Sequence, residues 1–244
     1  MVDLTDRVAL VTGGSRGIGR AVCLALANSG AAVAVNYRNR VREADTTVGE
    51  IRATGRRAIA IGADVSVGAS VEAMVREIEA ELGPIGVLVN NAGVATVRGL
   101  DDLTEEDFDR AIAVNLKSAF LCIRAVLPSM RARGWGRIVN MSSIAARGGG
   151  AVGVHYNASK AGLEGLTRAY ASRLAAEGVT VNAVAPALID TEMAAPLKQA
   201  GYAARIPIGR FGAAEEVAAA TLMALDNAFM TGQTISVNGG MLFT

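Results

Sequence analysis

The sequence has few of the side chains that build disulfide frameworks and metal centres. Its 244 residues include a single histidine, His155, and two cysteines, Cys23 and Cys122. The cysteines form no C-x-x-C pair and no cluster with metal-ligand spacing, which argues against a disulfide scaffold and against a metal site. Each lies in a segment of helical character, so we expect two buried thiols in a protein of the reducing cytoplasm.

The sequence also lacks an excess of either charge and a long apolar run. Lysine and arginine number 24 against 23 acidic residues, a net charge of +1. This balance does not favour a nucleic acid or an anionic membrane surface as the main partner. No apolar run approaches the ~20 residues that span a bilayer. The N-terminal stretch MVDLTDRVALVTGG carries an acidic residue at position 3, unlike a secretory signal peptide.

Short runs rich in β-branched residues recur between longer helical patterns, and most are apolar throughout rather than alternating. Such runs are typical of strands that are covered on both faces. The expected strands are Arg7 to Thr12, Ala31 to Asn36, Arg57 to Gly62, Ile85 to Asn90, Gly136 to Met141, Val179 to Val184 and Gln233 to Asn238.

Helical segments between these strands end before Gly30 and at Gly83, and Thr104 followed by Asp107 is typical of a helix start. Strands that alternate with helices imply right-handed crossovers and a parallel sheet. We therefore predict an α/β fold with one domain, residues 1–244, built as a Rossmann-type doubly wound sheet of seven parallel strands. The irregular segment at about 187–212 is predicted to cover a substrate.

The first expected strand leads into TGGSRGIG, with glycines at positions 13, 14, 17 and 19. The spacing is G-x-x-x-G-x-G rather than G-x-G-x-x-G. A glycine turn at this place lets backbone N–H groups approach a pyrophosphate at the positive end of the next helix. The alternative is an ordinary tight turn. Four glycines in seven positions after the first strand favour the dinucleotide site.

The end of the second expected strand reads Asn36-Tyr37-Arg38, without the carboxylate that holds the ribose 2′-hydroxyl in NAD sites. Arg16 lies inside the glycine loop. Two guanidinium groups can bind a 2′-phosphate by charge-assisted hydrogen bonds. We therefore expect NADP(H). The alternative is that Arg38 and Arg40 are solvated surface charges.

The stretch VHYNASK holds His155, Tyr156 and Lys160. Positions i and i+4 of a helix share a face, so the ammonium can reach the neighbourhood of the phenol. Lowering a tyrosine pKa from ~10 to ~7 needs roughly 4 kcal/mol, which one ammonium about 4 Å away supplies at an effective dielectric near 20. Neighbouring positions point about 100° apart. We therefore interpret His155 as a helix-start or rim residue and expect Tyr156 and Lys160 to do the chemistry.

Taken in order along the chain, these motifs resemble those of the short-chain dehydrogenases/reductases, and the resemblance spans nearly the whole chain. Length, the NYR end of the second strand and VNGGM are most similar to the 3-oxoacyl-[acyl-carrier-protein] reductase branch. The further matching motifs are ADV at 63–65, NNAG at 90–93, Asn115, Ser142-Ser143, Tyr156-x-x-x-Lys160, PALIDTEM at 186–193 and TGQTISVNGG at 231–240.

The resemblance implies four catalytic residues. Tyr156 would donate the proton to a carbonyl, and Lys160 would bind the nicotinamide ribose and lower the tyrosine's pKa. Ser143 would hydrogen-bond the substrate oxygen, and Asn115 would hold a water linked to Lys160. The cofactor-binding residues implied are Gly13, Ser15, Arg16, Gly17, Ile18, Gly19, Asn36, Arg38, Asp64, Val65, Asn91, Ala92, Gly93, Tyr156, Lys160, Pro186, Ile189 and Thr191.

The resemblance also implies a homotetramer, in which the helices around 111–130 and 156–177 pack across one interface and the C-terminal strand across another.

Two departures from the family pattern bear on function. Ala187 stands where a glycine usually follows Pro186, and alanine is strained there if φ is positive. Glu177 stands where carrier-protein reductases often have arginine, so an acidic acyl carrier protein is in question.

Basic residues could still serve an acidic carrier, since Arg131 and Arg133 lie at the end of one helix and Arg168 and Arg173 lie near Glu177. The leading hypothesis is NADPH-dependent reduction of a 3-oxoacyl thioester, carried by acyl carrier protein or coenzyme A, to the 3-hydroxyacyl form. A second hypothesis keeps the chemistry with another small ketone or secondary alcohol. A third, a non-catalytic NADP(H)-binding regulator, predicts damage to the Ser143, Tyr156 and Lys160 set, which is intact.

Overall fold

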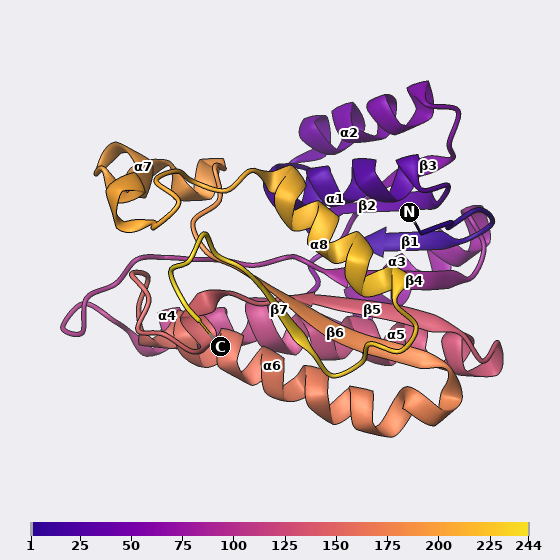
Figure 1. The fold of residues 1–244 in the computed structure, drawn as a ribbon. Coiled ribbons are helices and arrows are strands. Elements are labelled where there is room, and N and C mark those ends of the chain that lie inside the picture. The colour runs from indigo at the N-terminus through magenta and orange to yellow at the C-terminus, as the bar shows by residue number, and fades with distance from the viewer. Residues whose placement is uncertain (1, 244) are drawn as a thin grey trace.

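A computed structural model describes residues 2–243 and shows one parallel sheet of seven strands, with the order β3-β2-β1-β4-β5-β6-β7 (Figure 1). Every neighbouring pair runs parallel. The predicted fold is therefore confirmed, and two of the predicted strands match to the residue. The strands are β1 (Val8–Val11), β2 (Ala32–Tyr37), β3 (Ala58–Gly62), β4 (Ile85–Asn90), β5 (Gly136–Met141), β6 (Val179–Pro186) and β7 (Thr234–Val237).

Helices cover both faces of the sheet. One layer holds α1 (Gly17–Asn28), α2 (Val41–Ala53) and α8 (Ala214–Asp226), and the other holds α3 (Gly68–Glu81), α5 (Ser118–Ala132) and α6 (Val154–Leu174), with α4 (Glu105–Ile112) beside α6 (Figure 1). In β1, Ala9 and Val11 pack into the first layer, whereas Val8 and Leu10 pack into the second. Because both faces are buried, the strands are apolar at successive positions.

Both cysteines lie in this packing. Cys23 on α1 and Cys122 on α5 are free and fully buried, as expected. Burial raises the pKa of the Cys122 thiol to about 12, and it raises the pKa of Cys23 further still. A buried thiol of high pKa is inert near neutrality, so the two side chains act as small core residues.

The chain order of the sheet reverses between β1 and β4, and the two strand ends are tied together there. The Thr12 hydroxyl accepts hydrogen bonds from the backbone N–H groups of Asn91 and Ala92, each at 3.0 Å. Parallel strands place their carboxyl ends at one edge of the sheet, and ligands bind there where the order reverses. The residues that follow β1, β4, β5 and β6 therefore meet at one edge.

The segment predicted to cover a substrate has short helical turns: η4 (Glu192–Ala194), α7 (Ala195–Gln199) and η5 (Tyr202–Arg205). It projects from the body of the fold next to the start of α8 (Figure 1). Ile206 is buried in a small apolar cluster of its own, against which Leu197 and Tyr202 pack. Met193 is exposed instead. The apolar residues of this segment therefore mostly hold the segment together.

One helical run, Glu105–Ala132, is 28 residues long, and an 18-residue part of it has a mean hydropathy of 1.5, so by length and composition alone it could cross a membrane. The core helix of a globular protein passes the same test, and this run packs on the sheet through Cys122, Ile123, Val126 and Met130, all buried. Its apolar composition therefore follows from its place in the fold. The run contains a π-helical turn, η1 (Ala113–Lys117), between α4 and α5.

Candidate active site

The glycine loop between β1 and α1 is shaped by positions that admit no side chain. Gly13 and Gly17 have φ values of +63° and +53°, a region that suits glycine. A Cβ atom on Gly19 would lie 2.2 Å from the Gly13 carbonyl oxygen. The loop therefore folds tightly onto the N-terminus of α1, where free backbone N–H groups and the helix dipole favour a phosphate.

Two asparagine side chains hold this loop in place. The Asn36 amide accepts from Gly13 N at 3.2 Å and donates to three carbonyl oxygens, those of Tyr37, Ile61 and Ala63. The Asn91 amide donates to the carbonyl oxygens of Thr12 and Gly13 at 2.9 and 3.0 Å. The Asn36 side chain was expected to contact the cofactor; here it joins β2, β3 and the glycine loop, and its hydrogen bonds go to the protein.

The two arginines expected to bind a 2′-phosphate, Arg16 and Arg38, each lie beside a carboxylate. Arg38 Nε lies 3.0 Å from Oδ2 of Asp64, another residue expected to bind the cofactor. Hydrogen bonds from Ser66 lower the pKa of Asp64, and Arg38 lowers it further. Arg16 pairs with Glu192 of the covering segment. Arg40 is half exposed and pairs with Glu43, which agrees with a solvated surface role.

The covering segment lies over the glycine loop at a second point. A Cβ atom on Gly17 would lie 3.3 Å from the methyl group of Thr191. The segment is fixed at its base, since Asp190 N donates to Gly212 O and Gly212 N donates to Leu188 O, at 2.8 and 2.9 Å. Thr191, Arg16 and Glu192 thus join the covering segment to the loop that was predicted to hold phosphate.

Tyr156 and Lys160 lie on one face of α6, close to its first turn. The Lys160 side chain is 5% exposed, and its Nζ donates to the Met141 carbonyl oxygen at the end of β5, at 2.7 Å. The same nitrogen lies 5.8 Å from the centroid of the Tyr156 ring. Burial lowers the pKa of Lys160 to about 8, because a buried ammonium loses its hydration.

The acidity of the Tyr156 phenol depends on its burial. Burial raises the pKa of Tyr156, and the Ser143 hydroxyl lowers it by a smaller amount. The sequence predicted that the Lys160 ammonium lowers the pKa of this phenol, and that effect stays a prediction.

Asn115 lies next to this pair because of the π-helical turn in its helix. Its Oδ1 accepts from Val94 N at 2.8 Å, and its Nδ2 donates to Val94 O and to Ser159 Oγ, both at 3.0 Å. A Cβ atom on Gly93 would lie 3.3 Å from Asn115 Oδ1 and 3.6 Å from Lys160 Nζ. A π-helical turn re-aims the side chains of a helix and often marks a functional site.

Ser143 follows β5 and caps a short 3₁₀ turn, η2 (Ile144–Ala146), through a hydrogen bond from Ala145 N to its Oγ at 3.2 Å. The four predicted catalytic residues thus come together at the carboxyl edge of the sheet. Sequence reasoning missed three supporting groups: the Thr12 hydroxyl, the Met141 carbonyl and the Ser159 hydroxyl, which donates to Tyr156 O at 2.7 Å. Thr12 stood inside the glycine motif, whereas the other two carry no local signal.

His155 begins α6 as expected, but it does not lie at the rim. Its ring is 2% exposed, and Nε2 lies 3.0 Å from the Thr96 carbonyl oxygen. The ring therefore ties the start of α6 to the loop after β4.

Ala187 does not require a positive φ, because Asp6 is the one non-glycine residue with positive φ among residues 2–243. The replacement of glycine there adds no backbone strain.

Three of the residues considered for an acidic carrier, Glu177, Arg131 and Arg133, lie far from the tyrosine of the same chain, whereas Arg168 lies nearer to it on α6, beside Glu164. Glu177 follows the far end of α6, 21 residues after Tyr156, which is about 30 Å along a helix. There it pairs with Arg131. Arg133 donates to Ser129 Oγ and to the Ile85 carbonyl oxygen. Arg131 and Arg133 therefore do not flank the site that their own chain forms.

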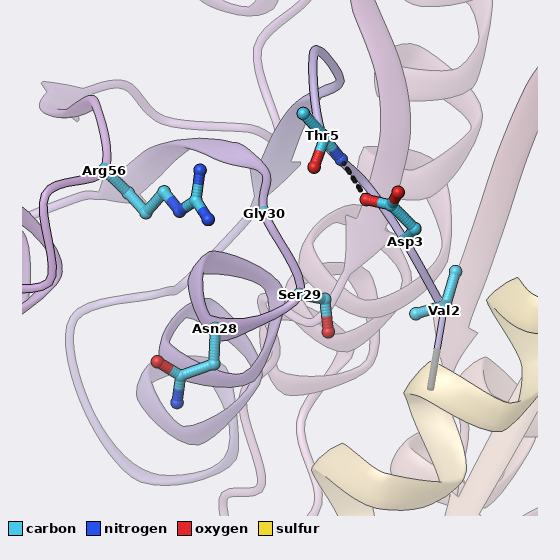
Figure 2. Close-up of a pocket in the computed structure, with 7 residues that line it drawn as sticks. All are labelled: Val2, Asp3, Thr5, Asn28, Ser29, Gly30 and Arg56. Carbon is cyan, nitrogen blue, oxygen red and sulfur yellow. Dashed lines mark hydrogen bonds between the residues drawn. The ribbon is translucent and has the colours of Figure 1, made fainter.

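A hollow of about 250 Å³ lies at the amino edge of the sheet, away from the predicted site residues (Figure 2). In it, Asp3 Oδ1 accepts from Thr5 N at 2.9 Å. Its lining is Val2, Asp3, Thr5, Asn28, Ser29, Gly30 and Arg56.

Within the described part of the chain, no group of three histidine, cysteine, aspartate or glutamate residues is placed to hold a metal ion.

Comparison with known proteins places this geometry in a family. The model of the short chain dehydrogenase family matches residues 7–201. The 3-oxoacyl-[acyl-carrier-protein] reductase of a Synechocystis species is 43% identical over 245 residues, which cover 99% of both chains. Nodulation protein G of Azospirillum brasilense is 39% identical and covers 98% of this chain and 99% of its own.

A solved structure agrees with these relatives. A short-chain type dehydrogenase/reductase from Mycobacterium marinum is 35% identical and superposes with a TM-score of 0.93, covering 98% of this chain and 96% of its own. The family resemblance inferred from the motifs is thereby confirmed. The chain belongs to the short-chain dehydrogenase family and is an oxidoreductase acting on CH–OH groups, similar to the 3-oxoacyl-[acyl-carrier-protein] reductases.

Proposed function

We propose that the protein uses NADPH to reduce the 3-oxo group of an acyl thioester to a hydroxyl group. The observation that carries this proposal is the joint placement of Tyr156 and Lys160, with the buried Nζ 5.8 Å from the ring centroid, beside Ser143. The names of the most similar relatives support the substrate class. Fold alone would not, because one fold hosts many substrates.

The glycine loop fits a dinucleotide. A cradle that excludes side chains at Gly13 and Gly19 lets a phosphate approach the backbone at the start of α1. When bound, NADPH supplies the hydride that reduces the carbonyl carbon. Arg38 and Arg16 would hold the 2′-phosphate, with Arg16 exchanging Glu192 for the phosphate. Asp64 and Val65 would lie at adenine, and the backbone of Ala92 and Gly93 along the cofactor.

The protein's own groups manage the proton. Tyr156 gives its hydroxyl proton to the carbonyl oxygen, and Ser143 donates a hydrogen bond to that oxygen as negative charge develops there. The Lys160 ammonium, fixed by the Met141 carbonyl, favours the phenolate that results. Asn115 donates a hydrogen bond to the Ser159 hydroxyl, on the residue before Lys160. The segment at 187–212 covers the substrate.

The carrier of the thioester is acyl carrier protein or coenzyme A. Arg131 on α5 is paired with Glu177, which lies about 30 Å from Tyr156 along α6 and the turn that follows it. An acidic carrier would therefore not meet Arg131 at the site of the same chain, and the nearer candidate, Arg168, is 60% exposed but lies beside the carboxylate of Glu164. This geometry favours coenzyme A, or a carrier that docks on a neighbouring copy.

We propose that the protein assembles as a homotetramer and acts in the cytoplasm. Phe108 on α4 and Phe120 on α5 are each about two-fifths exposed, at 41% and 40%, and the edge strand β7 is partly exposed throughout. Apolar side chains and a free strand edge of this kind are suited to burial against a second copy.

Light scattering after gel filtration should give four times the chain mass of 25.0 kDa; a monomer would contradict this.

The catalytic assignment predicts the effect of removing one oxygen atom. Tyr156→Phe should lower kcat with acetoacetyl-CoA by about 10²- to 10⁴-fold, because the general acid is lost. Tyr170→Phe, a change on the same helix, should leave kcat near that of the parent. Initial rates followed by NADPH absorbance test both. An unaffected Tyr156→Phe enzyme would refute the proton donor, and a parent that reduces no 3-oxoacyl thioester would refute the substrate class.

The cofactor assignment predicts a change of preference. Arg38→Asp should raise the KM for NADPH by about tenfold to a hundredfold, since a charge-assisted pair is worth about 1.5–3 kcal/mol, and should change the KM for NADH little. Arg42→Asp makes the same charge change at an exposed position of α2 and serves as the control. Equal losses for both cofactors in the Arg38 variant would contradict a 2′-phosphate contact.

The burial of Lys160 predicts a cost in stability. Its pKa of about 8 in the folded chain, against 10.5 ordinarily, corresponds to about 3 kcal/mol. This cost is fully present below pH 8 and disappears as the pH rises to 10.5. Lys160→Met should therefore be more stable than the parent at pH 7, with a margin that shrinks towards pH 10.5. Urea unfolding at both pH values measures this.

The lost hydrogen bond to Met141 will take about 1 kcal/mol from that margin. Lys117→Met, at an exposed position of η1, is the control and should change little at either pH. A Lys160→Met protein that is less stable than the parent at pH 7 would show that the ammonium is not desolvated.

A further inference from the structure

Glu164 is a buried carboxylate that the proposed chemistry does not use. It lies on α6 one turn beyond Lys160, and its side chain is 5% exposed. Carboxylates are rarely buried to this degree unless charged or hydrogen-bonded partners surround them. Its partners therefore indicate what the residue does.

Both oxygens of Glu164 contact the segment that contains Ser143. Ser142 Oγ donates to Oε1 at 3.3 Å, and Arg147 Nε donates to Oε2 at 3.0 Å. Ser142 directly precedes Ser143, and Arg147 follows it by four residues. A third group, Arg168 on the next turn of α6, is 60% exposed and lies 3.9 Å from Oε2. The carboxylate thus attaches both ends of the Ser143 turn to the tyrosine helix.

The backbone on either side of the Ser143 turn has further attachments: Ser142 N donates to the Val184 carbonyl oxygen at 2.7 Å, and Asn157 Nδ2 donates to the carbonyl oxygens of Gly148 and Gly149. Lys160 Nζ donates to the carbonyl oxygen of Met141, two residues before Ser143. Ser143 accepts a hydrogen bond from Ala145 N at its hydroxyl and one from Ala146 N at its carbonyl oxygen, and its hydroxyl also lies close enough to the Tyr156 phenol to lower that group's pKa. Arg147 is one-third exposed, so its guanidinium would be free to move if Glu164 did not hold it. Glu164 therefore contacts this segment at two places, Ser142 and Arg147, while Lys160 and Asn157 hold the backbone before and after it.

We propose that Glu164 is a positioning residue: it holds the Ser143 hydroxyl at the correct place relative to Tyr156. This inference rests on the proposed function of Ser143. A hydroxyl that stabilises developing charge must be fixed before the reaction, and a displacement of about 1 Å can cost about a hundredfold in rate. The charge of Glu164 matters because Arg147 binds a carboxylate more strongly than a neutral amide.

A purely structural role is the competing explanation, since breaking a buried ion pair destabilises proteins in general. The two explanations differ in what they predict when Ser143 is absent. A positioning residue that acts through the Ser143 hydroxyl has nothing left to position in Ser143→Ala. A structural residue would lower the rate by the same factor in both backgrounds.

A kinetic double-mutant cycle separates them. With NADPH and acetoacetyl-CoA, or any carbonyl compound that the parent reduces, Glu164→Gln should lower kcat by about tenfold or more. In the Ser143→Ala background the same change should lower kcat by less than about twofold. Glu177→Gln removes a carboxylate paired with arginine at the far end of the same helix and should leave kcat unchanged.

Equal factors in both backgrounds, or no effect of Glu164→Gln in the parent, would overturn the proposal. Arg147→Met provides a second variant that detaches the turn while leaving Glu164 beside Arg168, in case Glu164→Gln does not fold. It should reproduce the same dependence on Ser143, and equal factors in both backgrounds would again overturn the proposal.

Hydrogen exchange tests the positioning without activity. In Glu164→Gln, the amides of Ala145 and Ala146, which bond to Ser143, should lose about tenfold of their protection, while the amides of α6 keep theirs. Unchanged protection at the turn, or equal loss along α6, would refute the proposal. A parent without carbonyl reductase activity would instead refute the proposed function, and exchange would then decide on Glu164 by itself.

Discussion

The proposed chemistry depends on one buried ammonium, which the rest of the site is built to hold. Lys160 lies almost wholly out of contact with solvent, held by the Met141 carbonyl and facing the ring of Tyr156. Keeping a positive charge in such a place costs stability, which is why burial lowers its pKa to about 8. Proteins retain unfavourable groups of this kind at functional sites. The fold holds the charge by placing the carboxyl end of β5 against the first turns of α6.

Around this charge, polar side chains fix the carboxyl edge of the sheet. Thr12, Asn36 and Asn91 use their hydrogen bonds to hold the glycine loop against the strand ends. Asn115 does the same for the backbone after β4, from a π-helical turn. Glu164 attaches the turn that contains Ser143. One hydroxyl, three asparagine amides and one carboxylate thus fix the parts of the site. They hold the backbone that would meet a cofactor and the side chains that would meet a substrate.

The sequence predicted the fold and the grouping of the catalytic residues because their signals are local. Apolar runs bounded by glycine located β4 and β5 to the residue, and an i, i+4 spacing placed Tyr156 and Lys160 on one face. The Asn36 side chain bonds to the Ile61 carbonyl oxygen, and Arg16 pairs with Glu192. Each of these contacts joins residues 25 or more positions apart, so no local pattern reveals it. The raised pKa of Tyr156 likewise depends on burial by distant segments.

The central claim is that the Lys160 ammonium makes the Tyr156 phenol more acidic. The most direct test is a titration of Tyr156 by NMR with ¹³Cζ-labelled tyrosine and NADP⁺ present, in the parent and in Lys160→Met, with Tyr156→Phe to identify the signal. We predict a lower tyrosine pKa in the parent than in Lys160→Met, because the ammonium stabilises the phenolate. Equal pKa values in the two proteins would contradict the account.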